Sequence, residues 1–202
     1  MISGFAFGNY WCYDMPASLE IQIELPKADG GFGVTATKYG LLYSSFGIPN
    51  LFMPILAGIM FDKFGTRLST LLFATLLCIG QAIYTFGANE YDFNYLLAGR
   101  LVFGFGCCAM YVAQSAFVTK WFINYELSLG MACMSSFPLI GSFLSASVIP
   151  NIFTSYDEKV PKENGFYYAH LNGLWVCIIC YVGIIVLCVL DKYVEKTDDA
   201  WL

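Results

Sequence analysis

The chain has little charge for its length: only 12% of its 202 residues are Asp, Glu, Lys or Arg, whereas 58% are hydrophobic. A soluble domain carries about twice that share of charge, because its surface must face water. The deficit therefore predicts an integral membrane protein held in a lipid bilayer. The few charges lie in short segments, without the basic run that would favour a nucleic-acid partner. The net charge of −5 consequently gives little information about other partners.

Groups that carry enzymatic chemistry are scarce as well. His170 is the only histidine, so the chain has neither a second imidazole for a metal site nor a Ser/His/Asp set in one compartment. The Gly-rich stretch 28–34 is too short and irregular to bind a nucleotide phosphate, and we expect it to be a flexible connection. We therefore expect no enzyme activity, no metal and no cofactor. No Asn-x-Ser/Thr acceptor occurs, so N-glycosylation is not expected either.

Cysteine, in contrast, is plentiful, but all eight cysteines fall inside apolar runs. Thiols at membrane depth usually act as small packing residues, so we predict no disulfides. Cys177 and Cys180 have the spacing of half a zinc or redox site. Because no second pair accompanies them, helix packing is the favoured interpretation.

Long uncharged runs separate the charges, and a hydrocarbon core takes roughly 20 helical residues to cross. The runs predict an all-α membrane protein with six spanning helices, over about residues 1–23, 39–61, 67–88, 94–118, 127–150 and 168–190. Pro150 is expected to mark the end of the fifth helix, and 157–164 to form a charged loop. One side of the membrane then holds Lys63, Arg67, Lys120, Lys192 and Lys196, and the other holds Lys27, Lys38, Lys159 and Lys162. Five basic residues against four weakly favour the first side as cytoplasmic.

Two ionisable residues, Asp14 and Arg100, fall within these predicted spans. A charge in lipid costs several kcal/mol unless it is paired, so such residues are functional candidates by default. The fourth span also carries a stripe with spacings of 4, 3, 4 and 3 that suits a cavity wall: Arg100, Gly104, Cys107, Tyr111 and Gln114. On the first span, Tyr10 and Asp14 share one face, and Asn9 and Tyr13 share another.

Structural roles are the alternative for each of these residues. Arg100 and Asp14 each fall near a membrane boundary, where a charge can pair or simply anchor its helix. Gln114 alone would suit a hydrogen bond between two helices. His170 falls near the outer end of the last span, where contact with water would permit pH sensing.

A polar segment with three charges in six residues joins the second and third spans. It has the pattern Gly58-x-x-x-Asp62-Lys63-x-Gly65-x-Arg67 and is expected to be a tight hairpin. This pattern resembles the loop motif between helices 2 and 3 of the major facilitator superfamily. Leu96-x-x-x-Arg100, with the glycines after it, resembles the helix 4 motif of that superfamily. Pro138-x-x-Gly141 lacks the full glycine pattern of its antiporters.

A closer resemblance, to the branch that contains the lysosomal dipeptide uniporter, covers most of the chain. It is carried by Asn9–Ala17, Leu41–Tyr43, Pro49–Asn50, Cys78–Gln81, Gly99–Gly104, Ala113–Gln114 and Trp121–Phe122. The resemblance implies a uniporter of dipeptides or related organic solutes that works by alternating access in a lysosomal or other endomembrane. It implies a cytosolic hairpin at Asp62, luminal loops near Ala28 and Asp157, and a glycosylated luminal accessory subunit.

The same resemblance implies roles for individual residues. The hairpin residues Gly58, Asp62, Lys63, Gly65 and Arg67 would form the gating motif. The residues that would line the solute pathway are Asp14, Tyr13, Arg100, Tyr111, Gln114, Cys108 and Leu139. Two of these depart from the branch, because Cys108 falls where it has an acidic residue for the peptide amine and Leu139 where it has an arginine for the carboxylate. Both charged ends of a dipeptide would then lose their partner.

The superfamily is built from two six-helix halves, each made of two inverted three-helix repeats, with the substrate between the halves. Residues 1–202 correspond to the N-terminal half, and the C-terminal half is absent from them. We therefore expect a partner half, supplied either by the same full-length chain or by a second copy. The alternative is a non-transporting structural or accessory subunit of a membrane complex, which would keep the helices without the site.

Overall fold

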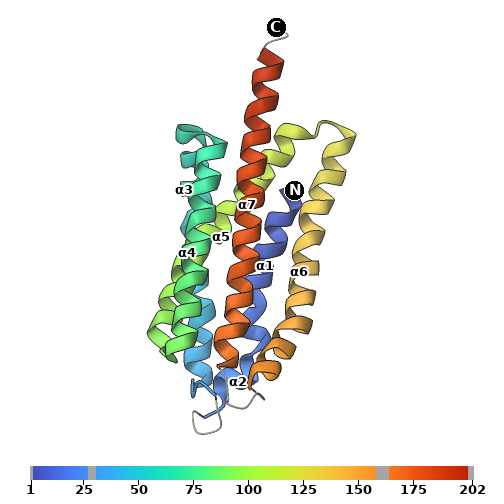
Figure 1. Cartoon of the computed structure of the whole chain (residues 1–202). Coiled ribbons are helices and arrows are strands. Elements are labelled where there is room, and N and C mark those ends of the chain that lie inside the picture. The colour runs from blue at the N-terminus through green and yellow to red at the C-terminus, as the bar shows by residue number, and fades with distance from the viewer. Residues whose placement is uncertain (1, 27–30, 158–163, 200–202) are drawn as a thin grey trace.

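The computed structural model describes residues 2–26, 31–157 and 164–199, and over these ranges the fold is helical throughout (Figure 1). The seven helices of the described residues are α1 (Ile2–Ser18), α2 (Glu20–Glu24), α3 (Ala36–Phe64), α4 (Thr66–Glu90), α5 (Phe93–Trp121), α6 (Tyr125–Asp157) and α7 (Gly165–Asp199). The six long helices run roughly side by side. The C-terminal ends of α3 and α7 lie at one end of the bundle, and α2 lies at the other. The predicted all-α class is confirmed.

Five of these helices, α3 to α7, are long and apolar enough to cross a membrane. The expected first span differs, because it is divided into α1 and the short α2 at Leu19. Pro16 lies within α1, and the Leu19 amide bonds to the Pro16 carbonyl at 3.2 Å. This bond spans three residues, so it closes a turn tighter than an α-helical one and redirects the chain.

The expected end of the fifth span at Pro150 is wrong, because α6 continues without a break to Asp157. Proline removes one backbone donor, and a neighbouring side chain can compensate for a local disturbance. Here the donor lost at Pro150 is the one that would bond the Ala146 carbonyl, and α6 tolerates this single loss. Of the expected loop 157–164, Asp157 is helical and 158–163 lie outside the described residues. The same applies to 27–30 in the Gly-rich stretch.

The predicted tight hairpin is present, and Gly65 is the one residue between α3 and α4. Its φ of 80° lies in the left-handed region, which glycine adopts without the strain that a Cβ would bring. The Gly65 amide caps α3 by donating to the Phe61 carbonyl at 3.0 Å. Across the turn, the Ser69 hydroxyl donates to the Met60 carbonyl at 3.0 Å, which fixes the angle between the two helices.

The helices pack in a regular set of pairs: α1 contacts α6 and α7, α5 contacts α3 and α4, and α4 contacts α7. Small residues permit the closest of these contacts. A Cβ added to Gly99 of α5 would lie 2.6 Å from the Tyr84 amide nitrogen of α4. One added to Gly80 of α4 would lie 2.5 Å from the Phe103 amide nitrogen of α5. The backbones of α4 and α5 therefore touch directly.

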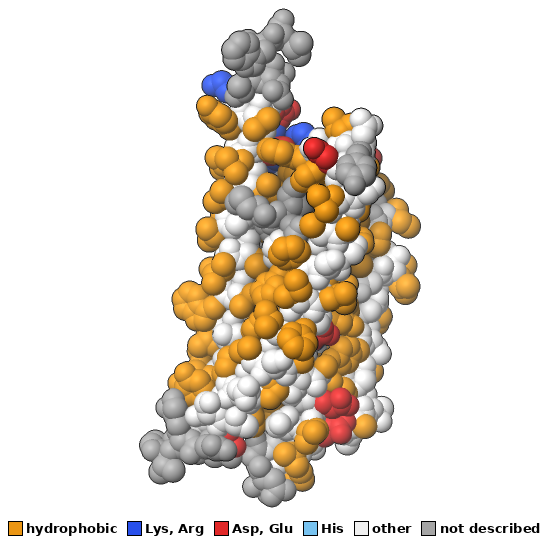
Figure 2. Space-filling view, turned by 90° about the vertical axis from the view of Figure 1, so that its right-hand side faces the viewer, with side chains coloured by type: hydrophobic (Ala, Val, Ile, Leu, Met, Phe, Trp, Pro, Cys, Tyr) orange, Lys and Arg blue, Asp and Glu red, His pale blue; other side chains and the backbone are white. Residues whose placement is uncertain are grey.

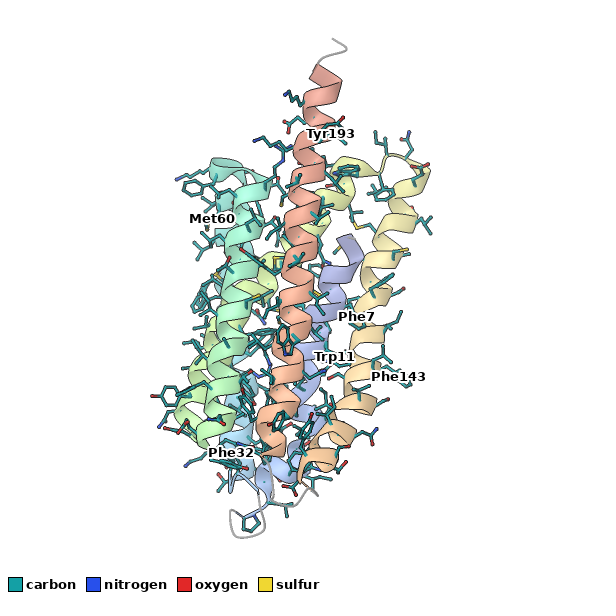
Figure 3. The ribbon with its side chains drawn as sticks, viewed as in Figure 1. Phe7, Trp11, Phe32, Met60, Phe143 and Tyr193 are labelled. Carbon is teal, nitrogen blue, oxygen red and sulfur yellow. The ribbon has the colours of Figure 1, made fainter. Side chains whose placement is uncertain are left out.

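The outer surface is that of a membrane protein. Hydrophobic side chains cover the middle of the face in Figure 2, and the charged ones gather mainly toward its ends. Phe143 of α6 projects away from the bundle and is 71% exposed (Figure 3). Six exposed polar side chains of α6 bond back to its own carbonyls four positions earlier: Ser135, Ser136, Ser147, Asn151, Thr154 and Ser155.

Candidate functional site

A hollow of about 570 Å³ opens between α1, α3 and α5. Polar side chains reach it from all three helices, and the described lining residues carry no charge: Asn9, Tyr10, Tyr13, Asn50, Tyr111 and Gln114. The remaining wall is apolar or thiol-bearing: Ala6, Phe46, Pro54, Cys107, Cys108 and Val112. A cavity of this size, with an apolar wall and a few polar groups, has the character of a small-molecule site.

Aromatic contacts fix the wall on the α1 side. The Tyr13 ring lies 4.7 Å from the Phe46 ring and 5.9 Å from the Tyr43 ring, which joins α1 to α3. The Tyr10 ring packs edge-on against Tyr13 at 6.0 Å. The Asn9 amide donates to the Cys107 sulfur at 2.9 Å, which joins α1 to α5. These tyrosines present both π-faces and hydroxyl groups to a solute.

Arg100 lies behind this wall and does not line the hollow. Its side chain is buried on α5, and Nη2 donates to the Tyr13 carbonyl at 2.9 Å. The guanidinium carbon lies 5.1 Å from the Tyr84 ring and 6.0 Å from the Tyr13 ring. The predicted stripe of α5 is therefore divided, because Cys107, Tyr111 and Gln114 reach the hollow whereas Arg100 is one layer deeper.

The other predicted pathway residues separate in the same way. Cys108 lines the hollow beside Tyr111. Asp14 is half-buried on α1, next to Tyr13 in sequence, and is not among the lining residues. Leu139 of α6 is 69% exposed and also lies away from the hollow. The structure thus gathers Tyr13, Cys108, Tyr111 and Gln114 of the predicted set around one cavity.

A second polar centre lies at the hairpin end of the bundle, around Asp191 of α7. The Asp191 carboxylate accepts hydrogen bonds from Arg67 Nε at 2.5 Å, Lys120 Nζ at 3.0 Å and Trp121 Nε1 at 3.1 Å. Its side chain is only 3% exposed, and Arg67 also pairs with Glu195. This cluster joins the start of α4, the end of α5 and the last turns of α7.

Sequence reasoning placed Arg67 in the gating motif but assigned no role to Asp191. The available signal was an acidic residue directly after an apolar run, at the end of the bundle where Lys120 and Arg67 were also expected. Asp62 and Lys63 do not take part in the ion pairs described for this cluster. Both are exposed on the last turn of α3.

The expectation of a wet environment for His170 is wrong. Its side chain is only 2% exposed, and its ring packs edge-on against the Tyr84 ring at 4.7 Å. Gln81 and Thr85 of α4 both donate to the His170 carbonyl, at 3.4 and 3.2 Å. These contacts press the first turns of α7 against α4, so the histidine faces the core.

The comparison with known proteins now gives the family. The pattern of the Major Facilitator Superfamily matches residues 2–200, and the chain belongs to this superfamily. It is therefore a multi-pass integral membrane protein related to transporters.

Individual relatives match most of this chain, but this chain covers less than half of each relative's length. The lysosomal dipeptide transporter of Mus musculus is 33% identical over 194 residues, which cover 94% of this chain and 40% of that protein. The protein of that name from Bos taurus is 31% identical over 193 residues, with the same coverage. The hexuronate transporter of Bacillus subtilis is 25% identical over 142 residues, 69% of this chain and 32% of that protein. The chain thus spans about two fifths of the length of the dipeptide transporters that it matches.

Proposed function

We propose that residues 1–202 form the N-terminal six-helix half of a transporter that moves small solutes across a membrane by alternating access. The observation that carries this proposal is the hollow between α1, α3 and α5. The hollow gathers uncharged hydrogen-bonding groups and tyrosine rings in one cavity, whereas the rest of the surface of these helices is mainly apolar. Small polar solutes bind to such groups.

The packing of the helices supports a pair of inverted three-helix repeats. In that arrangement α1, α3 and α4 form one repeat, and α5, α6 and α7 form the other. Exchanging the repeats converts the contact of α1 with α6 into that of α5 with α3, and both contacts are present. The contact of α4 with α5 likewise corresponds to that of α7 with α1. The first repeat would use α1 with α2 as its first span, which gives six spans in total.

A partner half follows from the exposure of the site. Tyr111, in the wall of the hollow, is 50% exposed, and lipid would offer its hydroxyl no partner. A second six-helix half over this face would enclose the solute. Asp62 would then meet that half at the cytosolic end, because its carboxylate is exposed there and outside the Asp191 cluster. The positive end of a helix dipole would be a suitable partner for it.

The relatives favour a lysosomal membrane and a dipeptide or related organic solute, moved by uniport. The curated relatives named above as dipeptide transporters match almost the whole of this chain. A glycosylated luminal accessory subunit would fit the same branch and the lack of acceptor sites here. It would contact the end of the bundle that carries α2.

The test is uptake of radiolabelled dipeptides and neutral amino acids by the complete transporter in proteoliposomes. We expect saturable uptake that Asp62→Asn lowers about tenfold, because the neutral amide lacks the negative charge that would meet the partner half at the cytosolic end. Glu126→Gln is the matched control, since Glu126 is an exposed carboxylate at the same end, and its uptake should be unchanged. Normal uptake by both single variants, Asp62→Asn and Arg100→Ala, would contradict the residue assignments. No uptake of any solute by the wild type would contradict the function.

A further inference from the structure

The core behind the hollow contains a buried cation, Arg100, for which the described residues supply no counter-ion. Arg100 is 4% exposed, and its Nη2 atom donates to the Tyr13 carbonyl at 2.9 Å. A guanidinium has five N–H donors and no acceptor. Within the ranges that the structure describes, no carboxylate forms an ion pair with it. Asp14, the acidic residue next to Tyr13, is half-buried and does not reach it.

Aromatic rings surround the guanidinium, but ring faces do not accept hydrogen bonds from its remaining in-plane N–H groups. The Arg100 Cζ atom lies 5.1 Å from the Tyr84 ring and 5.9 Å from both the Tyr43 and Phe103 rings. Ring faces attract a cation, yet they do not accept the in-plane N–H groups as an oxygen or an anion would. A desolvated charge of this kind is strongly disfavoured unless a partner of opposite sign reaches it.

Further polar groups without partners lie around the same point. The Tyr84 hydroxyl and the His170 Nδ1 atom are both buried and have no described hydrogen-bond partner. Tyr84 is 3% exposed and His170 is 2% exposed, and their rings are 4.7 Å apart. A hydroxyl and an imidazole can each donate a hydrogen bond. The cluster therefore combines one positive charge with two neutral groups that can each donate or accept a hydrogen bond, and the described residues bring no carboxylate to it.

Tyr13 separates this cluster from the hollow. Its ring lines the hollow and lies 6.0 Å from the Arg100 Cζ atom, and its carbonyl holds the guanidinium. A change of the Tyr13 side-chain rotamer would open the hollow toward Arg100 without movement of a helix. Such rotamer changes are fast compared with domain motions.

We propose that Arg100, Tyr84 and His170 form an anion site behind Tyr13, which binds a small inorganic anion or the carboxylate of the transported solute. The carboxylate version rests on the proposed function and assigns one end of the solute to Arg100. The inorganic version does not depend on it. In both versions the anion completes the coordination of a charge that the described residues leave without a counter-ion.

The experiment measures thermal unfolding of the purified full-length protein in sodium isethionate, a bulky sulfonate background. Chloride or acetate replaces isethionate at constant ionic strength, and neutral acetamide is the control for acetate. We expect a saturable rise of about 2 °C or more in the unfolding midpoint, since a ligand of the folded state stabilises it. A rise with chloride alone identifies an inorganic site, and a rise with acetate but not acetamide identifies a carboxylate site. No rise with either anion overturns the proposal.

Variants connect the shift to these residues. Arg100→Gln should abolish the rise and Arg100→Lys should retain part of it, because the charge persists without the planar fork of donors. Tyr84→Phe should raise the half-saturating concentration about fivefold through the loss of one hydrogen bond, and it serves if Arg100→Gln does not fold. Lys63→Gln, on the exposed last turn of α3, is the control and should keep the full rise. An unchanged rise in Arg100→Gln or in Tyr84→Phe would contradict the assignment. Wild-type uptake without any anion effect would overturn the anion site and leave the proposed function intact.

Discussion

Arg67 and Asp191 are 124 positions apart in the chain, yet Nε of Arg67 and Oδ2 of Asp191 lie 2.5 Å from each other. The contact joins the start of α4 to the last turns of α7. Lys120 and Trp121 bond to the same carboxylate from the end of α5. One buried acid thus connects three helices at the hairpin end of the bundle.

Asp191→Asn should destabilise the bundle, because Arg67 and Lys120 both pair with the buried Asp191 carboxylate and would lose its negative charge. Each hydrogen bond to a charged group contributes roughly 1.5–3 kcal/mol, and the partial exposure of Arg67 and Lys120 reduces that value. We expect a loss of about 1–3 kcal/mol, visible as a thermal midpoint in detergent that is lower by several degrees. Asp62→Asn is the control and should melt like the wild type. Equal midpoints for wild type and Asp191→Asn would show that the cluster contributes nothing to stability.

Gly99→Ala should force α4 and α5 apart. The new Cβ would lie 2.6 Å from the Tyr84 amide nitrogen and 2.9 Å from the Gly80 carbonyl oxygen, and neither backbone atom can move alone. Overpacking of this kind costs about 1–3 kcal/mol. Gly47→Ala is the matched control, because no atom lies within 4 Å of its Cβ and alanine favours a helix. We expect Gly99→Ala to lower the thermal midpoint and Gly47→Ala to leave it unchanged or raise it. A Gly99→Ala midpoint equal to that of the wild type would contradict the packing.

Tyr111→Ala and Leu139→Ala should separate two residues that the sequence placed in one pathway. Tyr111 lines the hollow, whereas Leu139 is 69% exposed and lies outside it. We expect Tyr111→Ala to raise the KM for uptake about tenfold, a loss of about 1.4 kcal/mol of binding. Leu139→Ala should leave KM unchanged. The reverse result would place the solute against α6 instead of α5.

Cys12 and Cys177 should form a disulfide under forced oxidation. Their sulfur atoms are 3.3 Å apart, and a disulfide bond of about 2 Å requires only a small approach of α1 and α7. Copper phenanthroline would take two electrons and release two protons from the thiol pair. Mass spectrometry of peptides should then show a Cys12–Cys177 link, with two free thiols lost. Cys133→Ser should still form the link, Cys12→Ser should not, and its absence in the wild type would contradict the measured proximity.

Features set by neighbouring residues could be predicted from the sequence, whereas features set by distant ones could not. The hairpin at Gly65 followed from local charge and glycine, and the uncharged runs gave the approximate spans. The end of α6 was wrong because a proline removes only one backbone hydrogen bond, and the sequence alone does not show whether the helix tolerates that loss.

The candidate site shows the same division. Tyr111 and Gln114 were found because helical spacing places them on one face of α5. The burial of His170 depends on Gln81, Tyr84 and Thr85, which are more than 80 residues earlier. Asp191 was missed because its partners lie on other helices. Long-range packing of this kind leaves no local pattern in the chain.

The exposed hydroxyls of α6 have a consequence for motion. Ser135, Ser136 and Ser147 each donate to a carbonyl of their own helix, four positions earlier. Their hydrogen bonds are therefore independent of whatever lies against this face. A neighbouring helix could shift along α6 by a full turn, and none of these bonds would have to break and re-form. Polar residues on this surface thus add no hydrogen-bond barrier to sliding, although they lie at membrane depth.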